Sequence, residues 1–382
     1  MRIINTSGSL ATTHRDKFNS NVGIDLHKVS LTIADRDSGG DLVKTADIEC
    51  KCVNKIKDFI TSLPRPIHCA IESVGMYEWL WELLEPIVDK LTLADAVELK
   101  YRAGRRQAKT DKINARFFSL LVYKDDLPVS FVPDKTTRQF RKVCRHWHAT
   151  SEFLADIKIR MRWILIQHNL AGPGSITGES GRHWFLGFGH LLDSASSFTF
   201  SQLLDTVEHI ELQRMSIRRE ILRFSQMPQY KPDIDLCCTV PGIADILSAI
   251  IVAEVAGFHR FSGPDAIACY TGLTERTEES GGKRSQGKIS CAGPAALRWA
   301  LCEAATTMVR SDPVYLGMYN HILKNTGIKG KAKVAMARKL IGWLWKMAKT
   351  REPFRRGGST QHNRNANIAR QKARSIANLA AA

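Results

Sequence analysis

Three acidic residues, Asp25, Glu72 and Asp111, stand at points of the sequence from which their carboxylates can act together. Asp25 lies between apolar neighbours in a predicted strand, Glu72 ends another, and Asp111 falls in the first turn of a predicted helix. Carboxylates on adjacent strands and a facing helix can hold one or two Mg²⁺ ions, which prefer oxygen ligands. In phosphoryl transfer such ions stabilise both the attacking oxygen and the leaving oxygen. The pattern therefore predicts a metal-dependent phosphoryl-transfer site, although each residue taken singly could be a solvated or capping side chain.

Asp111 and Asn114 are three residues apart, so their side chains lie on one face of the predicted helix. The chain before this helix is strongly basic, and a cationic rim beside a phosphoryl-transfer site would attract nucleic acid. A solvated surface is the alternative for the same charges. The candidate nucleic-acid-binding residues here are Lys100, Arg102, Arg105, Arg106 and Lys109.

A second candidate site is centred on Ser280, which precedes Gly281, Gly282, Lys283 and Arg284. Glycines allow a backbone to approach phosphate closely, and the two cations would offset negative charge as it develops. A serine hydroxyl is a weak nucleophile unless its surroundings activate it. The residues alone therefore leave two interpretations open, a phosphate-binding segment with a nucleophilic serine or a flexible loop.

The segment 239–245 is similar to a helix-hairpin-helix turn, whose backbone N–H groups can contact a phosphate. Gly242 is the nucleic-acid-binding candidate in this turn. Ala244 stands where a second glycine is usual, so a tight turn between two packed helices is the alternative.

The elements that must position the acidic residues alternate between strands and helices. Strands are predicted at 22–27, 30–34, 67–72 and 90–94, and helices at 76–84 and from about residue 110. The first two strands are close enough to pair as a hairpin. This mixture indicates one α/β domain over residues 21–148, after a flexible tail over residues 1–20.

Long helices replace this pattern from about residue 150. Apolar residues between 203 and 224 follow alternating spacings of four and three, interrupted by Arg214, which predicts a coiled coil or helical hairpin over 149–232. An ordinary helix packed on a core is the alternative. Residues 171–200, rich in Gly and Ser, are predicted to form a loop. A mainly helical domain over 233–350 and a basic tail over 351–382 complete the chain.

The charge of the chain points to a polyanionic partner. Lys and Arg number 55 against 38 Asp and Glu, which gives a net charge of +17 over 382 residues. A membrane surface would also attract this charge, but the sequence has no apolar run of about 18 residues. It also has no secretory pattern at its start, so we expect no membrane association and a cytoplasmic location.

Taken together, these segments resemble the bridge-RNA-guided transposases of the insertion-sequence "one-ten" family, also called DEDD recombinases. The order and spacing of the similar segments fit over roughly residues 21–350. These segments are 23–27, 72–77, 109–115, 240–243, 260–262, 270–273, 280–283, 287–290 and 337–340.

The resemblance implies an RNase H-like (RuvC-like) α/β N-terminal domain, a helical coiled-coil middle region and a mainly α C-terminal transposase domain. It implies that Asp25, Glu72 and Asp111 bind Mg²⁺, with Mn²⁺ as an alternative, and that Ser280 forms a phosphoserine link with DNA. It further implies a noncoding bridge RNA as guide, donor and target DNA as substrates, a homo-oligomer (dimer and tetramer) and a bacterial cytoplasm. The expected activity is RNA-guided DNA transposition and recombination.

Asn114 departs from the family pattern, which has a fourth aspartate at this position. Asn114 is still a candidate fourth metal ligand through its amide oxygen, but it brings no negative charge, so metal affinity should fall. A working variant, a degenerate copy and a deliberate mutation all fit the sequence. Two rival functions also stay open, a RuvC-like metal-dependent junction nuclease and a catalytically silent nucleic-acid-binding relative.

Overall fold

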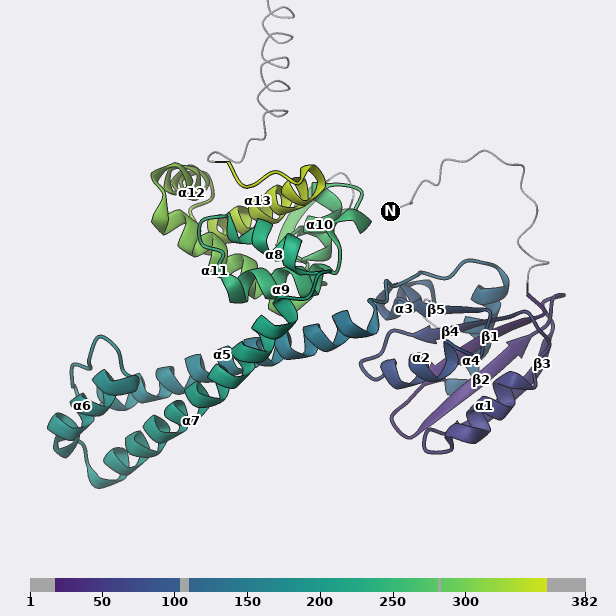
Figure 1. Ribbon diagram of the computed structural model, residues 1–382, viewed down its shortest axis with the longest axis horizontal. Coiled ribbons are helices and arrows are strands. Elements are labelled where there is room, and N and C mark those ends of the chain that lie inside the picture. Colours follow the sequence, from purple (N-terminus) through teal and green to yellow (C-terminus); the bar gives the residue numbers. More distant parts are fainter. Residues whose placement is uncertain (1–17, 104–109, 281–282, 356–382) are drawn as a thin grey trace, which may run out of the picture. The chain divides into compact units, whose positions relative to one another are not determined.

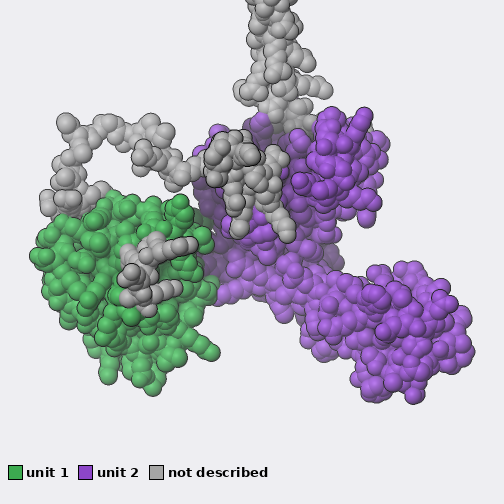
Figure 2. Space-filling model, turned by 180° about the vertical axis from the view of Figure 1, so that it is seen from behind, with its two compact units in different colours: residues 1–132 green, residues 133–382 purple. Residues whose placement is uncertain are grey.

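The computed structural model describes residues 18–103, 110–280 and 283–355, with the backbone alone given for 276–280 and 283–288. The chain divides into two compact units, Met1–Val132 and Pro133–Ala382, which Figure 2 distinguishes by colour. The predicted domain boundary after residue 148 falls inside one long helix, Lys135–Gln167. The start of this helix already belongs to the second unit, since its Phe140 and Cys144 are buried in the core of that unit.

The predicted tails fall mostly outside the described residues. At the N-terminus, however, Phe18 is already buried, with its ring centroid 5.0 Å from that of His68, and the first strand begins at Ser20. The tail predicted over residues 1–20 therefore extends too far into the domain.

The first unit is built on a five-stranded mixed sheet with the order β3-β2-β1-β4-β5 (Figure 1). Strands β1 and β2 pair antiparallel, which confirms the predicted hairpin, and β4 and β5 continue the sheet parallel to β1. The strands are β1 (Ser20–Leu26), β2 (Ser30–Arg36), β3 (Leu42–Glu49), β4 (Ile67–Glu72) and β5 (Lys90–Ala94).

Helices cover both faces of this sheet. Ile24 of β1 and its neighbours pack against Ile56 of α1 and Leu80 of α2 on one face. Helix α4 packs on the opposite face, where Gly23 offers no side chain. The helices of this unit are α1 (Val53–Thr61), α2 (Glu78–Leu84), α3 (Ala96–Ala103) and α4 (Asp111–Tyr123).

The second unit begins with an antiparallel pair of long helices, α5 (Lys135–Gln167) and α7 (Ser194–Ser225), which forms the predicted helical hairpin (Figure 1). A hairpin core, which includes Leu154, Met161, Phe200 and Val207, holds their far ends together. Arg214 interrupts the apolar contacts between the two helices. Its Nη1 donates to the Ser151 hydroxyl at 2.6 Å, and its guanidinium lies 3.7 Å from the centroid of the Trp147 ring.

The prediction of a loop over residues 171–200 is wrong. Helix α6 (Gly178–Phe188) and the 3₁₀ helix η2 (Gly189–Leu191) occupy much of that segment. Trp184 and Phe185 lie with their ring centroids 5.8 and 5.4 Å from that of Phe200 on α7. These tertiary contacts stabilise a helix whose glycines and serines disfavour it locally.

The C-terminal part of the second unit is mainly helical, as predicted. Its core combines α9, α11 and α13 with the first half of α5. No helix among the described residues is long and apolar enough to cross a membrane. The elements are α8 (Lys231–Cys238), α9 (Asp245–Val255), η3 (Phe258–Arg260), α10 (Pro264–Tyr270), β6 (Glu275–Ser280), β7 (Lys283–Ile289), α11 (Ala295–Ser311), α12 (Pro313–Thr326) and α13 (Lys329–Thr350).

Glu254 of α9 is a fully buried carboxylate that arginines of α5 neutralise. Arg145 donates from Nε to one Glu254 oxygen at 2.6 Å and from Nη2 to the other at 2.9 Å. The Nε of Arg141 lies 3.7 Å from the same carboxylate and donates to the carbonyl oxygen of Ala253. These contacts attach the first half of α5 to the C-terminal helices.

Replacement of Glu254 by alanine is expected to lower the free energy of unfolding of the second unit by about 3 kcal/mol or more. The reason is that removal of Glu254 leaves Arg141, whose side chain is only 12% exposed, without the carboxylate that offsets its charge. Urea denaturation followed by tryptophan fluorescence measures the change. The control is Glu220→Ala, which breaks an exposed pair with Arg223 on α7 and should have little effect. Equal denaturation midpoints in the two variants would contradict the prediction.

Candidate metal centre and nucleophile

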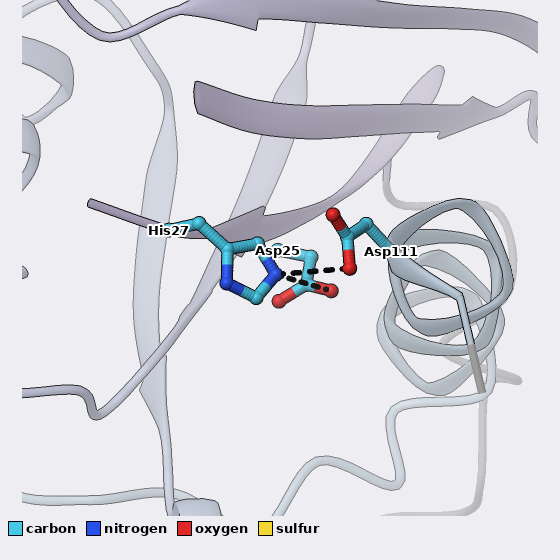
Figure 3. A group of neighbouring side chains, drawn as sticks. All are labelled: Asp25, His27 and Asp111. Carbon is cyan, nitrogen blue, oxygen red and sulfur yellow. Dashed lines mark ion pairs between the residues drawn. The ribbon is translucent and has the colours of Figure 1, made fainter. Parts of the chain in front are cut away.

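Asp25, His27 and Asp111 converge at the end of β1 (Figure 3). The Nε2 atom of His27 lies 3.5 Å from Asp25 Oδ2 and 3.1 Å from Asp111 Oδ1. The Asp25 side chain is 3% exposed, whereas those of His27 and Asp111 are 49% and 55% exposed. The site therefore has one buried carboxylate and two donors that a ligand from solvent can reach.

Helix α4 brings Asp111 to β1. The hydroxyl oxygen of Thr110 accepts a hydrogen bond from the N–H of Ile113 at 3.3 Å, so Thr110 caps the helix and Asp111 is its first residue. Asn114, one turn later, donates from Nδ2 to Asp25 Oδ2 at 3.0 Å. The predicted shared face of Asp111 and Asn114 is confirmed, since both side chains contact residues at the end of β1.

Two further contacts fix α4 on the sheet. Arg36 of β2 donates from Nε to the Ser119 hydroxyl at 3.2 Å, and Lys112 lies 3.1 Å from Asp47 of β3. Together with Asn114 they hold the helix at three points along its length. The position of Asp111 is therefore set by the first unit itself.

Glu72 ends β4, the strand beside β1, as predicted. Ile24 of β1 and Ile71 of β4 form the last pair of these parallel strands. Asp25 is the next residue of β1, and Glu72 is the next residue of β4. Their side chains therefore lie on the same face of the sheet, the face that α4 covers. Glu72 is half-buried and does not belong to the close group of Asp25, His27 and Asp111.

Burial raises the pKa of the Asp25 carboxyl, and the nearby charge of Asp111 adds to this effect. The Asn114 N–H and the imidazole of His27 act in the opposite direction. A buried carboxylate beside another carboxylate is costly unless positive charge offsets both. A bound cation would offset the negative charge of both carboxylates.

The donors present fit a divalent metal ion. Two carboxylates and one imidazole offer ligand atoms that all lie within 4.8 Å of one another. Carboxylate oxygens suit Mg²⁺ and Mn²⁺, and imidazole suits transition metals.

Replacement of Gly23 by alanine is expected to displace α4 and to destabilise the first unit by about 1–3 kcal/mol, as overpacking does. A Cβ atom at Gly23 would lie 2.3 Å from the Ser119 nitrogen and 2.5 Å from the Ala115 oxygen. Thermal denaturation measures the effect. Gly75→Ala is the control, because a Cβ there meets nothing within 4 Å. An unchanged melting temperature in Gly23→Ala would show that α4 tolerates the extra atom.

Ser280 is the last residue of β6, and its backbone pairs with Lys283 of β7 in a two-stranded antiparallel sheet. Of the two interpretations of this segment, the flexible loop does not hold for the described backbone, which forms the paired strands β6 and β7 with Ser280 at the end of β6. Gly281 and Gly282 lie outside the described residues, and the side chains of Ser280, Lys283 and Arg284 do too.

The basic candidates before α4 have different surroundings. Lys100 of α3 is exposed, whereas Arg102 donates to Asp126 at 2.6 Å and pairs with Glu98, so its charge is already neutralised. Arg105, Arg106 and Lys109 lie outside the described residues. Nucleic-acid binding by these residues stays a prediction.

Gly242 has a structural role in the turn between α8 and α9. Its φ is +90°, and a Cβ would lie 2.7 Å from the Ala304 oxygen and 2.8 Å from the Met308 nitrogen of α11. A tight turn between packed helices therefore accounts for this glycine. Its proposed contact with a phosphate stays a prediction.

The N-terminal half of α13 carries a group of cations next to the hairpin. One cavity of about 320 Å³ is lined by Leu273, Glu275 and Ile289 at the hairpin base and by Lys331 and Arg338 of α13. A second cavity of similar volume shares Gly330 with the first. Its cationic lining residues are Arg310, Lys329 and Lys333.

His27 is the member of this group that was not among the residues predicted from the sequence. The signal was present, because residues two apart in a strand point to the same side of the sheet, and His27 follows Asp25 by two. We treated it only as part of an apolar strand. Its place between Asp25 and Asp111 becomes evident only when α4 packs on β1.

Residues 235–320 match the model of the transposase IS116/IS110/IS902 family. The matched segment begins in α8, contains the β6–β7 hairpin with Ser280 and ends in α12. No curated protein matches the chain. The match supports a transposase activity that acts on DNA, and it covers a part of the second unit only.

Proposed function

We propose that the chain is a DNA transposase whose first unit binds Mg²⁺ or Mn²⁺ and whose Ser280 attacks DNA. The observation that carries this proposal is the convergence of Asp25 and Asp111 at one point, in a chain that also contains a transposase-family segment. We further propose an RNase H-like fold for the first unit, supported by its five-stranded mixed sheet with Asp25 on the central strand.

Asp25, Asp111 and Glu72 would hold the metal ion, which when bound stabilises the charge that develops on phosphate oxygens. Asn114 holds one oxygen of Asp25 through its N–H, so that the carboxylate keeps a fixed direction. The exposed side of Asp111 leaves the site open to a DNA strand.

The Ser280 hydroxyl would attack a DNA phosphorus atom, so that an O–P bond forms to the serine and the bond to a DNA oxygen breaks. The hydroxyl proton leaves the nucleophile, and the departing DNA oxygen takes up a proton. One phosphodiester replaces another, and the energy of the bond is kept for rejoining. The cations along α13 support a polyanion beside this hairpin.

We also propose that a bridge RNA guides the protein to donor and target DNA and that the active form is a homo-oligomer, a dimer or a tetramer. The net charge of +17 supports a nucleic-acid partner without specifying RNA.

Removal of copurifying RNA is expected to abolish recombination, and readdition of that RNA is expected to restore it. Sequencing of the RNA should return a noncoding transcript encoded beside the gene, and its affinity should fall steeply with salt. Undiminished recombination after complete nuclease digestion would refute guidance by RNA.

The same substrates distinguish the rival functions. A protein–DNA adduct supports the transposase. Metal-dependent nicking without an adduct supports a junction nuclease. Binding without cleavage, under all metal conditions, supports a silent nucleic-acid-binding protein.

A further inference from the structure

We propose that His27 is a metal ligand and that its imidazole makes the site of the first unit bind Mn²⁺ in preference to Mg²⁺. This inference rests on the proposed metal site and deepens it, because it assigns a ligand and a metal preference that the acidic residues alone do not give.

The first argument is the spacing of the donor atoms. Two ligands at right angles around a metal ion, each at about 2.1 Å, are separated by about 3 Å. The His27 Nε2 atom lies 3.1 Å from Asp111 Oδ1 and 3.5 Å from Asp25 Oδ2, with the ring directed between both carboxylates (Figure 3). The ring nitrogen is therefore spaced from each carboxylate nearly as neighbouring ligands of one octahedral ion are.

The second argument is how the backbone places the ring. His27 follows the last residue of β1, and its N–H donates to the Ser30 carbonyl at 2.9 Å, which fixes the turn into β2. Because Asp25 and His27 are two residues apart in extended chain, their side chains point to the same side of the sheet. The ring is half-exposed, so a hydrated ion can reach it.

The third argument is the direction of the Asn114 amide. Its nitrogen, which cannot bind a metal ion, faces Asp25 at 3.0 Å. In this arrangement the Asn114 nitrogen supplies a hydrogen bond to Asp25 and no ligand atom. The imidazole of His27 supplies the additional ligand, and as a neutral group it adds no negative charge.

The metal preference follows from this donor set. Mg²⁺ prefers oxygen ligands in near-ideal octahedral geometry, whereas imidazole nitrogen strengthens binding of first-row transition metals. Among the two metals proposed for the site, Mn²⁺ is the one whose affinity a ring nitrogen raises. Loss of the ring should therefore weaken Mn²⁺ binding much more than Mg²⁺ binding.

The test is Mn²⁺ binding to the full chain, with electron spin echo measurements that detect a ¹⁴N nucleus bound to the ion. The wild-type protein is expected to show a coupled histidine nitrogen, and His27→Ala is expected to lose it. The dissociation constant for Mn²⁺ should rise roughly tenfold in the variant, because one ligand of a transition metal is lost. Magnesium affinity, measured by competition, should change much less.

His146→Ala is the matched control, because His146 is an exposed histidine of α5 in the second unit. It should keep both the nitrogen signal and the Mn²⁺ affinity. Circular dichroism and thermal denaturation of His27→Ala show whether the fold is intact, and His27→Gln provides a variant of similar polarity that also lacks the ring nitrogen.

The outcomes separate this inference from the proposed function. Manganese bound with no nitrogen signal in the wild-type protein would overturn the role of His27 and leave the carboxylate site standing. A nitrogen signal that persists in both folded His27 variants would overturn it as well. No binding of Mn²⁺ or Mg²⁺ at millimolar concentration would refute the metal site itself and, with it, the proposed function.

Discussion

Asparagine in place of Asp25 is expected to lower the rate of DNA strand cleavage roughly a thousandfold, because a metal ion contributes several kcal/mol and each 1.36 kcal/mol is a factor of ten. Asp25 is the buried carboxylate of the site, and its oxygen contacts both Asn114 and His27. The substitution removes a negative charge but keeps the size of the side chain. Cleavage of a labelled DNA substrate, with and without EDTA, measures the loss.

Asp35→Asn is the matched control for this experiment. Asp35 is equally buried, on the neighbouring strand β2, but it pairs with Val22 and therefore faces the opposite side of the sheet. Burial raises the pKa of Asp35 to about 6, so its carboxylate destabilises the fold at neutral pH and its replacement should preserve cleavage. Cleavage by Asp25→Asn at the rate of this control would remove Asp25 from the reaction.

Alanine in place of Ser280 is expected to eliminate the covalent protein–DNA adduct and all recombination, while binding of RNA and DNA and oligomerisation persist. The reason is that the hydroxyl oxygen is the atom that would bond to phosphorus, and alanine has no atom that can replace it. Denaturing electrophoresis of labelled DNA detects the adduct, and peptide mapping of the slow band identifies the residue.

Ser285→Ala controls for damage to the hairpin. Ser285 lies on β7, where its backbone pairs with Glu278, so the variant changes the same small sheet without touching the proposed nucleophile. It should form the adduct normally. An adduct that survives in Ser280→Ala, or that maps to Ser285, would assign the chemistry to another residue.

The sequence predicted those strands and helices of the first unit whose residue pattern agrees with the burial of their side chains in the structure. Alternating apolar residues predicted β1, β2, β4 and β5, and Thr110 followed by Asp111 is typical of a helix start. Strand β3 and helices α1 and α3 were missed, and α3 occupies part of the segment before residue 110 that was predicted as a basic loop. The residues of β3 are mostly exposed at the edge of the sheet, so they carry little of the apolar alternation that marks a strand.

The candidate site was predictable as a set of carboxylates but not as a geometry. Asp25 and Asp111 are 86 positions apart, and only the close packing of α4 on Gly23 brings them together. His27 was missed for the same reason, since its importance depends on Asp111. The role of Ser280 depends on the second unit and stays a prediction from the family resemblance.

Helix α5 belongs to two separate apolar cores. Its first half contributes Phe140 to the core of the C-terminal helices, and its second half contributes Leu154 to the hairpin core. The polar contacts of Arg214 with Ser151 lie between these two regions. Because each core has its own apolar contacts, the two ends of one continuous helix can lose their structure in separate steps. We therefore expect the backbone amides of α5 to exchange hydrogen with solvent through two separate openings, one at each end of the helix.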